Sequence, residues 1–234
     1  MGRLEGRLAL ITGASRGFGA AIAERFAEEG AKLILVARTT GGLEEVDDRV
    51  RASGGEATLV PQDLTKHEAI DELGGAIAQR FGYLDILIGN AAELGPLSPL
   101  AHIDPNTFER SIDLLATTNY RLIRSFDPLL KASKAGRAIF VTSDVAQTPR
   151  AFWGAYAAGK AALEALVMTY AAETANTNIR VNLLDPGPMR TRLRGNAYPG
   201  EDKDAVPLPK ERCDIVVDLA TADCRYHRER FSNT

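Results

Sequence analysis

The chain has 234 residues, of which 45% are hydrophobic and 25% are charged, and its formal net charge is -3. This length suits one substantial hydrophobic core, and the acidic balance argues against general nucleic-acid binding, which needs clustered positive charge. No segment approaches the roughly 20 apolar residues of a membrane span, and the apolar run 8–11 indicates a first strand, not a signal peptide. Two cysteines and three scattered histidines indicate neither a disulfide framework nor a metal site, so we expect a cytoplasmic protein.

Short aliphatic runs alternate with stretches of helical periodicity along the whole chain. Strands are predicted at 7–12, 32–37, 57–61, 84–89, 137–143 and 178–184. Their continuous apolar character is typical of parallel strands that are covered on both faces. Helices are predicted at 17–30, 41–53, 66–82, 105–133 and 153–176. The alternation predicts a single α/β domain over residues 1–234, a three-layer, doubly wound parallel sheet of the Rossmann type whose ligands bind beyond the carboxyl ends of the strands.

The first predicted strand runs directly into a glycine-rich turn and then into a helix. Gly13 permits a tight turn, and Gly17 and Gly19 let the backbone approach a pyrophosphate, which the helix N-terminus attracts. A plain strand-to-helix turn also favours glycine, but the position in a first βαβ unit favours a dinucleotide site. The residues of this turn that we expect at the cofactor are Gly13, Ser15, Arg16, Gly17, Phe18 and Gly19.

The second predicted strand ends in Ala37-Arg38-Thr39, with no acidic residue. Sheets that bind NAD usually carry an acid there, which bonds the ribose 2′-hydroxyl. Arg38 and Arg16 can instead bind a 2′-phosphate, which predicts NADP(H) in preference to NAD(H). Two solvated surface arginines are the alternative interpretation.

Tyr156 and Lys160 are four residues apart on a predicted helix, so their side chains share a face, and Ser143 ends the fifth predicted strand. The pKa of a free tyrosine is about 10. We expect the Lys160 ammonium to lower the pKa of Tyr156, so that the phenol can exchange a proton with a substrate oxygen. Ser143 supplies a second hydrogen bond to that oxygen, where negative charge develops. This set predicts hydride transfer between a nicotinamide and a carbonyl or secondary alcohol.

The glycine spacing, the segments 143–146 and 156–163, and the Asp185-Pro186-Gly187 turn together resemble the classical short-chain dehydrogenase/reductase family. The resemblance covers nearly the whole chain and is weakest after about residue 195. It implies an oxidoreductase that acts on the CH–OH group of a small molecule with NADP as acceptor, with Asp63 contacting adenine and Thr191 holding the nicotinamide carboxamide. It implies further cofactor contacts from Leu64, Asn90, Ala91, Tyr156, Lys160, Pro186, Gly187 and Met189. It also implies a homodimer or homotetramer, and we expect neither nucleic acid nor membrane as a partner.

The sequence departs from the family pattern at three places. Ala92 stands where the family usually has the last glycine of an Asn-Asn-Ala-Gly motif, and Leu115 stands in place of a fourth catalytic residue, an asparagine. That asparagine helps to anchor a water that links the lysine to solvent, so we expect slower proton delivery. Asn119, one turn later, either substitutes for it or is only a polar helix residue. The C-terminus lacks the family's glycine-rich final strand, and a shortened strand is expected around 226–231.

The region 190–209 is rich in charge, glycine and proline and predicts a mobile lid over the site. Its arginines, Arg190, Arg192 and Arg194, either attract an anionic group or form a solvated face. The residues on segments that should border the substrate cleft are Glu93, Leu94, Phe152 and Trp153. Two other functions stay open, a nucleotide-binding regulatory or scaffold protein with weakened catalysis, and an isomerase or lyase on the same fold. Nothing in the sequence selects a substrate or a direction of reaction.

Overall fold

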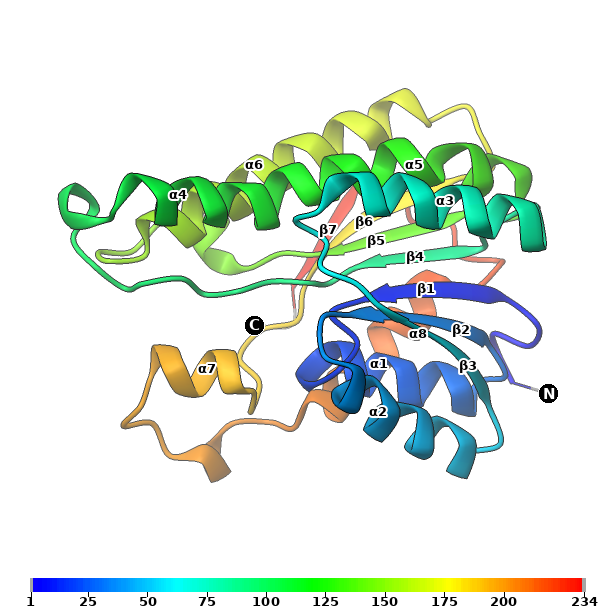
Figure 1. Cartoon of the computed structure of the whole chain (residues 1–234), viewed down its shortest axis with the longest axis horizontal. Coiled ribbons are helices and arrows are strands. Elements are labelled where there is room, and N and C mark those ends of the chain that lie inside the picture. The colour runs from blue at the N-terminus through cyan, green and yellow to red at the C-terminus, as the bar shows by residue number, and fades with distance from the viewer. Residues whose placement is uncertain (1, 233–234) are drawn as a thin grey trace.

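Seven parallel strands form one sheet in the computed structural model, which describes residues 2–232 of the chain (Figure 1). The strands are β1 (Leu8–Thr12), β2 (Lys32–Ala37), β3 (Glu56–Pro61), β4 (Ile86–Gly89), β5 (Arg137–Val141), β6 (Arg180–Asp185) and β7 (Glu229–Ser232). Their order is β3-β2-β1-β4-β5-β6-β7, so the order reverses between β1 and β4. The predicted doubly wound parallel sheet in one domain is confirmed.

Helices cover both faces of this sheet (Figure 1). The helices are α1 (Gly17–Glu28), α2 (Thr40–Ala52), α3 (His67–Phe81), α4 (Pro105–Ile112), α5 (Thr118–Ala132), α6 (Gly154–Glu173), α7 (Arg192–Ala197) and α8 (Asp214–Ala220). One face carries α1, α2 and α8, and the other carries α3, α5 and α6. A hydrophobic core lies on each face of the sheet, and alternate residues of β1 point into the two cores. Ile11 belongs to the same core as Phe26, and Leu10 belongs to the same core as Phe126. Burial on both faces is why the strands are apolar throughout.

The predicted helix 105–133 is continuous but irregular. Asp104 caps its start, because its carboxylate accepts a hydrogen bond from the backbone N–H of Thr107 at 3.0 Å, and Pro105 occupies the first helical position. Between α4 and α5 lies a π-helical turn, Asp113–Thr117, which packs against α6. Hydrophobic periodicity does not distinguish one π turn from an α-helical turn, so the sequence prediction missed it.

The ends of several elements differ from the prediction. β5 ends at Val141, so Ser143 lies two residues beyond the strand and does not end it. The short helices α7 and α8 were not predicted, and α7 lies inside the segment expected as a lid. Hydrogen bonding with neighbouring segments, which is not local in sequence, decides such ends.

The chain closes with β7, which pairs with β6. A shortened last strand is therefore confirmed, although it begins at Glu229 and not near Tyr226. Arg228 enters the strand with a φ of 62°, in the left-handed region that favours glycine, while its N–H donates to the carbonyl of Val181 at 2.7 Å. The register of β7 follows from this contact.

Two kinds of feature are absent from the part of the chain that the structure describes. Within residues 2–232, no helix combines the length and the apolar character that crossing a membrane requires. In the same residues, no three His, Cys, Asp or Glu side chains gather closely enough to hold a metal ion.

Candidate active site

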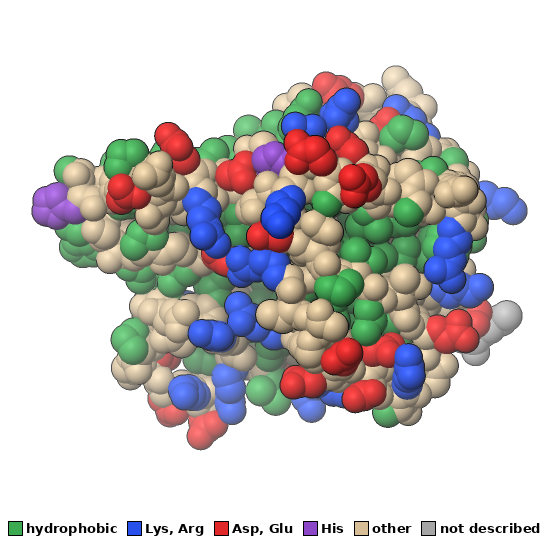
Figure 2. Space-filling view, viewed as in Figure 1, with side chains coloured by type: hydrophobic (Ala, Val, Ile, Leu, Met, Phe, Trp, Pro, Cys, Tyr) green, Lys and Arg blue, Asp and Glu red, His purple; other side chains and the backbone are tan. Residues whose placement is uncertain are grey.

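A cleft of about 1230 Å³ lies at the carboxyl ends of the strands. It spans the point where the strand order reverses, which is where doubly wound sheets bind ligands. Figure 2 shows Lys and Arg side chains on both sides of the hollow between the upper helices and the segment that carries α7. The predicted site residues that line the cleft are Gly13, Ser15, Arg16, Gly17, Phe18, Arg38, Asp63, Leu64, Asn90, Ala91, Ser143, Tyr156, Lys160, Pro186, Gly187, Met189 and Thr191.

The glycine-rich turn needs its glycines for two different reasons. Gly13 and Gly17 have φ values of 65° and 58°, which other residues rarely adopt. Gly19 does not line the cleft; a Cβ there would lie 2.3 Å from the carbonyl oxygen of Gly13. The absence of a side chain at Gly19 therefore allows α1 to pack closely against the turn at Gly13. No side chain caps α1 at Arg16, so its first N–H groups remain open to an anion.

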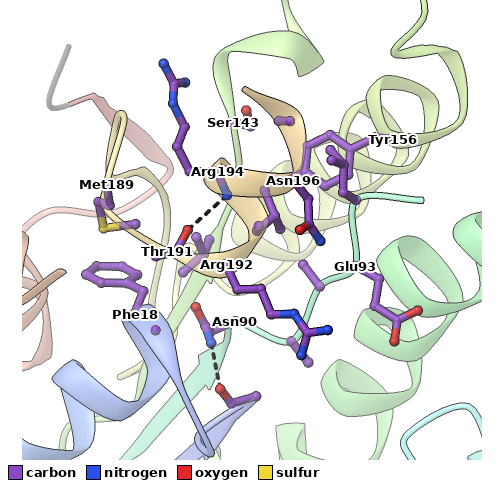
Figure 3. Close-up of a pocket in the computed structure, with 18 of the residues that line it drawn as sticks. Phe18, Asn90, Glu93, Ser143, Tyr156, Met189, Thr191, Arg192, Arg194 and Asn196 are labelled. Atoms are coloured by element: carbon purple, nitrogen blue, oxygen red, sulfur yellow. Dashed lines mark hydrogen bonds between the residues drawn. The ribbon is translucent and has the colours of Figure 1, made fainter. Parts of the chain in front are cut away.

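Thr12 connects the two strands on either side of the reversal, and the sequence analysis did not single it out. Its hydroxyl donates to the carbonyl of Ile88 at 3.0 Å and accepts from the N–H of Asn90 at 2.9 Å and of Ala91 at 3.1 Å. The Asn90 amide donates to the carbonyl of Thr12 at 2.9 Å, and Figure 3 shows Asn90 at the floor of the pocket. A polar residue at the end of an apolar strand was the available signal.

The expected 2′-phosphate site lies beside an ion pair. Arg38, after β2, pairs with Glu93, and Glu93 is also 3.8 Å from Arg110. The Arg16 side chain has no hydrogen bond or ion pair with any residue in 2–232. Burial alone raises the pKa of Asp63, but two hydrogen bonds from Thr65 and the charge of Arg38 outweigh it, so the pKa lies below its ordinary value. Asp63 is therefore an ionised acceptor at the edge of the cleft.

The structure brings the three predicted catalytic residues together at one end of the cleft. Lys160 lies one turn after Tyr156 on α6, with its Nζ 5.8 Å from the centre of the Tyr156 ring. Lys160 Nζ donates to the carbonyl of Val141 at 2.7 Å, which ties α6 to β5. The Ser143 hydroxyl donates to Asp144 at 3.1 Å, and Asp144 pairs with Arg150. Asp144 thus holds the Ser143 hydroxyl in the protein alone.

The expected effect of Lys160 on Tyr156 is not found in the protein alone. Burial, followed by the charges of Asp185 and Asp144, raises the pKa of Tyr156 above its ordinary value. Burial also lowers the pKa of Lys160 to about 8, against the opposing charges of Asp185 and Glu164. The sequence prediction that the ammonium lowers the pKa of the phenol is not met in the protein alone, because burial and the charges of Asp185 and Asp144 all raise that pKa.

Leu115 is fully buried in the π turn and packs with Tyr156 and Val145. A Cβ on Gly159 would lie 2.7 Å from Cδ1 of Leu115, so α6 and the π turn approach closely there. The side-chain amide of Asn119 donates to the carbonyl of Leu115 at 2.9 Å. This hydrogen bond occupies the amide N–H of Asn119, and whether Asn119 replaces the missing asparagine stays a prediction.

The segment after β6 folds over the mouth of the cleft. The Thr191 hydroxyl caps α7 by accepting from the N–H of Arg194 at 3.2 Å (Figure 3). Arg194 pairs with Glu201 and Arg190 pairs with Asp204, whereas the Arg192 side chain has no such partner within residues 2–232. In Figure 3, Arg192 extends into the pocket between Asn90 and Glu93.

Aromatic side chains join this segment to the catalytic end. Trp153 contacts Tyr156 edge-on, with ring centres 6.0 Å apart, and contacts Tyr198 at 5.8 Å. Arg150 donates to the Tyr198 hydroxyl at 2.9 Å. Phe152 is 56% exposed and lies outside the cleft, so its expected place in the pocket wall was wrong, whereas Glu93, Leu94 and Trp153 do line the cleft.

Comparison with known proteins gives concordant matches. A family model described as short chain dehydrogenase matches residues 7–202. The oxidoreductase YciK of Escherichia coli is 32% identical over 225 residues, which cover 95% of this chain and 89% of that protein. A Pseudomonas syringae structure described as a short chain dehydrogenase aligns with a TM-score of 0.95 and 33% identity, covering 99% of this chain and 96% of that one.

A Shigella flexneri structure described as a short chain dehydrogenase complexed with NADP aligns with a TM-score of 0.93. It is 30% identical and covers 99% of both chains. The match of the family model over most of the chain agrees with the order of the glycine turn, Ser143, Tyr156 and Lys160 in the cleft. The chain therefore belongs to the short-chain dehydrogenase/reductase family of oxidoreductases.

Proposed function

We propose that the protein is an NADP(H)-dependent oxidoreductase that transfers a hydride between nicotinamide and a carbonyl or secondary alcohol. The observation that carries this proposal is the joint placement of Ser143, Tyr156 and Lys160 at one end of a single cleft. The other end of the same cleft carries the glycine-rich turn, Arg16 and Arg38. A proton-transfer group and a dinucleotide site thus share one space of suitable size.

The residues around the glycine-rich turn fit NADP(H). Gly13 and Gly17 allow a close backbone approach, and the open N-terminus of α1 favours a pyrophosphate. Arg16 is unpaired and Arg38 follows β2 with no acid at that place, so both can bind a 2′-phosphate. The NADP complex of the Shigella flexneri relative supports this choice.

The bound nicotinamide supplies or accepts the hydride. Tyr156 is protonated at neutral pH because its pKa is raised, so it donates a proton to the carbonyl oxygen during reduction. The Ser143 hydroxyl, which in the protein alone donates to Asp144, would turn its one proton to the same oxygen, where negative charge develops. Lys160 holds positive charge beside the phenol, and the apolar residues around Tyr156 exclude water.

The substrate end of the cleft has an apolar wall with a cationic rim. Leu94, Trp153 and Leu193 lie along the wall, and Arg192 extends from α7. This lining suits a small carbonyl compound with an apolar body. We propose residues 190–209 as the lid over it, because Arg150 and Trp153 hold Tyr198 of that segment at the mouth.

The first test is a binding titration with NADPH and NADH. We expect tighter NADPH binding, and we expect Arg38→Ala to weaken NADPH binding about 10- to 100-fold, the loss of a charge-assisted hydrogen bond, while NADH binding changes little. NADPH oxidation with a panel of aldehydes and ketones then tests catalysis, and Tyr156→Phe should abolish it. Equal affinities that Arg38→Ala leaves unchanged, or full activity in Tyr156→Phe, would overturn the proposal.

Leu115 favours a second candidate, an NADP(H)-binding regulatory or scaffold protein with weakened catalysis. The buried leucine offers no hydrogen bond where the family has an asparagine side chain. Tight NADPH binding without carbonyl reduction by any member of the panel would support this candidate over the first.

We also propose a cytoplasmic homodimer or homotetramer, assembled through the two long helical stretches. Both cysteines are free thiols, as a reducing compartment favours. Tyr120, which is 47% exposed, lies on one of these helical stretches. Light scattering after size-exclusion chromatography gives the molar mass, and a monomer would contradict the proposed assembly.

A further inference from the structure

Arg230 lies on the edge strand β7, and its side chain reaches the segment that carries Ser143. Its side chain is only 16% exposed, with Nε 3.0 Å from Oε1 of Glu164 and Nη2 3.2 Å from Oδ2 of Asp185. Nη2 also donates to the carbonyl oxygen of Ser143 at 3.3 Å. One guanidinium therefore joins β7 to α6, to the end of β6 and to the segment that follows β5.

Each carboxylate that Arg230 contacts holds a further part of the site. Oδ1 of Asp185 accepts from the N–H of Gly187 at 3.0 Å, in the turn where Gly187 has a φ of 71°. Oε1 of Glu164 accepts from the Thr142 hydroxyl at 2.7 Å, one residue before Ser143. Arg230 thus contacts the carbonyl of Ser143 directly. It reaches Thr142 through Glu164 and the Gly187 turn through Asp185.

The same groups determine the charge around Lys160. Glu164 lies one helical turn after Lys160, and the side chains of Glu164 and Asp185 are 14% and 5% exposed. With Lys160 protonated, the charges of Lys160, Arg230, Glu164 and Asp185 cancel. The other charge that faces Tyr156 is Asp144, and Arg150 neutralises it. Removing Arg230 would leave one buried negative charge unpaired, which is strongly unfavourable.

We propose that Arg230 is a positioning residue of the hydride-transfer site, which holds Ser143 and the Gly187 turn in place and neutralises the two carboxylates beside Lys160. The inference rests on the proposed function, because it gives Ser143 and Lys160 the roles stated above. A planar fork with several donors suits this place, since it bonds two carboxylates and a carbonyl at once.

The first test needs no substrate. The full-length protein is labelled with ¹³C-lysine, and the Lys160 signal, assigned by its loss in Lys160→Arg, is followed by NMR as the pH is raised. We expect a wild-type pKa near 8. In Arg230→Met the midpoint should rise by at least about one pH unit, because the uncompensated carboxylate favours the ammonium.

Two variants make this titration decisive. Arg228→Met removes the same charge from the same segment, and the Arg228 side chain has no hydrogen bond or ion pair within residues 2–232, so the Lys160 midpoint should stay at the wild-type value. Adding Asp185→Asn to Arg230→Met restores the charge balance and should return the midpoint toward wild type. Equal midpoints in the two Met variants, or no return in the double variant, would overturn the inference.

The positioning role has its own measurement. Arg230→Lys keeps the charge but loses the fork, so the Lys160 midpoint should hold while kcat for NADPH-dependent carbonyl reduction falls roughly tenfold, and KM for NADPH should rise by less than kcat falls. An unchanged kcat would overturn the positioning role. If the wild-type protein reduces no carbonyl compound, the proposed function fails, while the Lys160 titration still decides the inference.

Discussion

Burial shifts the pKa values of Tyr156 and Lys160 in opposite directions, and in each case it favours the neutral form of the side chain. The pKa of Tyr156 is raised, and the pKa of Lys160 is lowered to about 8. A neutral phenol is a proton donor, which is the form that carbonyl reduction requires.

The rate of carbonyl reduction should therefore depend on the charge of Lys160. Below about pH 7 both side chains are protonated and the rate should be constant; as pH rises through about 8, Lys160 loses its charge and the rate should fall. Lys160→Arg keeps a permanent charge and should remove the descending limb near pH 8, even if it lowers the maximal rate. The measurement is kcat/KM at saturating NADPH between about pH 6 and about pH 10. A rate that rises steadily over this range would contradict the prediction.

Glu93 is expected to tune cofactor affinity at the other end of the cleft. It pairs with Arg38, and both side chains are about half-exposed, so the pair contributes only about 0.2 to 1 kcal/mol. A 2′-phosphate must compete with the Glu93 carboxylate for the same guanidinium. Glu93→Gln should therefore tighten NADPH binding by up to about fivefold and leave NADH nearly unchanged. Calorimetric titration decides this, with Glu109→Gln as a surface control, and weaker NADPH binding would count against it.

At the scale of elements, the π turn places a fully buried leucine against α6. Leu115→Asn would put an amide among Tyr156, Val145 and Leu94, at a cost of about 1 to 3 kcal/mol if the amide finds no partner. If the missing asparagine limits proton delivery to Lys160, the same variant should raise kcat. Leu115→Met conserves volume and should lose less than about 1.5 kcal/mol with no gain in rate. Urea unfolding and turnover measure the two effects, and an unchanged or lower kcat in Leu115→Asn would refute the role of the missing asparagine.

The elements that the sequence predicted well are those whose signal is local. The strand Leu8–Thr12 and helix α1 follow from an apolar run, a glycine turn and a helical period, and the order of Tyr156 and Lys160 on α6 follows from their spacing. The missed features depend on partners distant in sequence. Arg230 finds Glu164 66 residues away, and the Thr12 hydroxyl meets Ile88 76 residues away. The neighbouring residues do not identify either partner, although a polar Thr12 at the end of an apolar strand does mark that position.

At the scale of the whole molecule, the two edges of the sheet have different roles. The carboxyl edge is hollow and carries Tyr156, Lys160 and the glycine turn. The amino edge is closed by two buried arginines: Arg7 donates to the carbonyl of Ala220 at 2.6 Å, and Arg137 donates to the carbonyl of Thr221 at 2.9 Å. These bonds attach the segment after α8 to the sheet, and that segment leads into β7.

Replacing Arg137 should therefore lower the free energy of unfolding and leave the properties of the cleft unchanged. Arg137 is 3% exposed and also donates to the carbonyls of Ala222 at 2.6 Å and Cys224 at 3.2 Å, so Arg137→Met leaves the buried carbonyl of Thr221 and two partly buried ones without this donor. We expect a loss of about 2 to 4 kcal/mol in the free energy of unfolding in urea, whereas Arg124→Met, at a 57% exposed side chain whose partner Asp71 is 42% exposed, should change it by less than about 1 kcal/mol. Under native conditions NADPH binding and the Lys160 midpoint should stay at wild-type values in Arg137→Met, because Arg137 lies at the opposite edge from the cleft. A large shift of that midpoint in Arg137→Met would mean that the two edges are not independent.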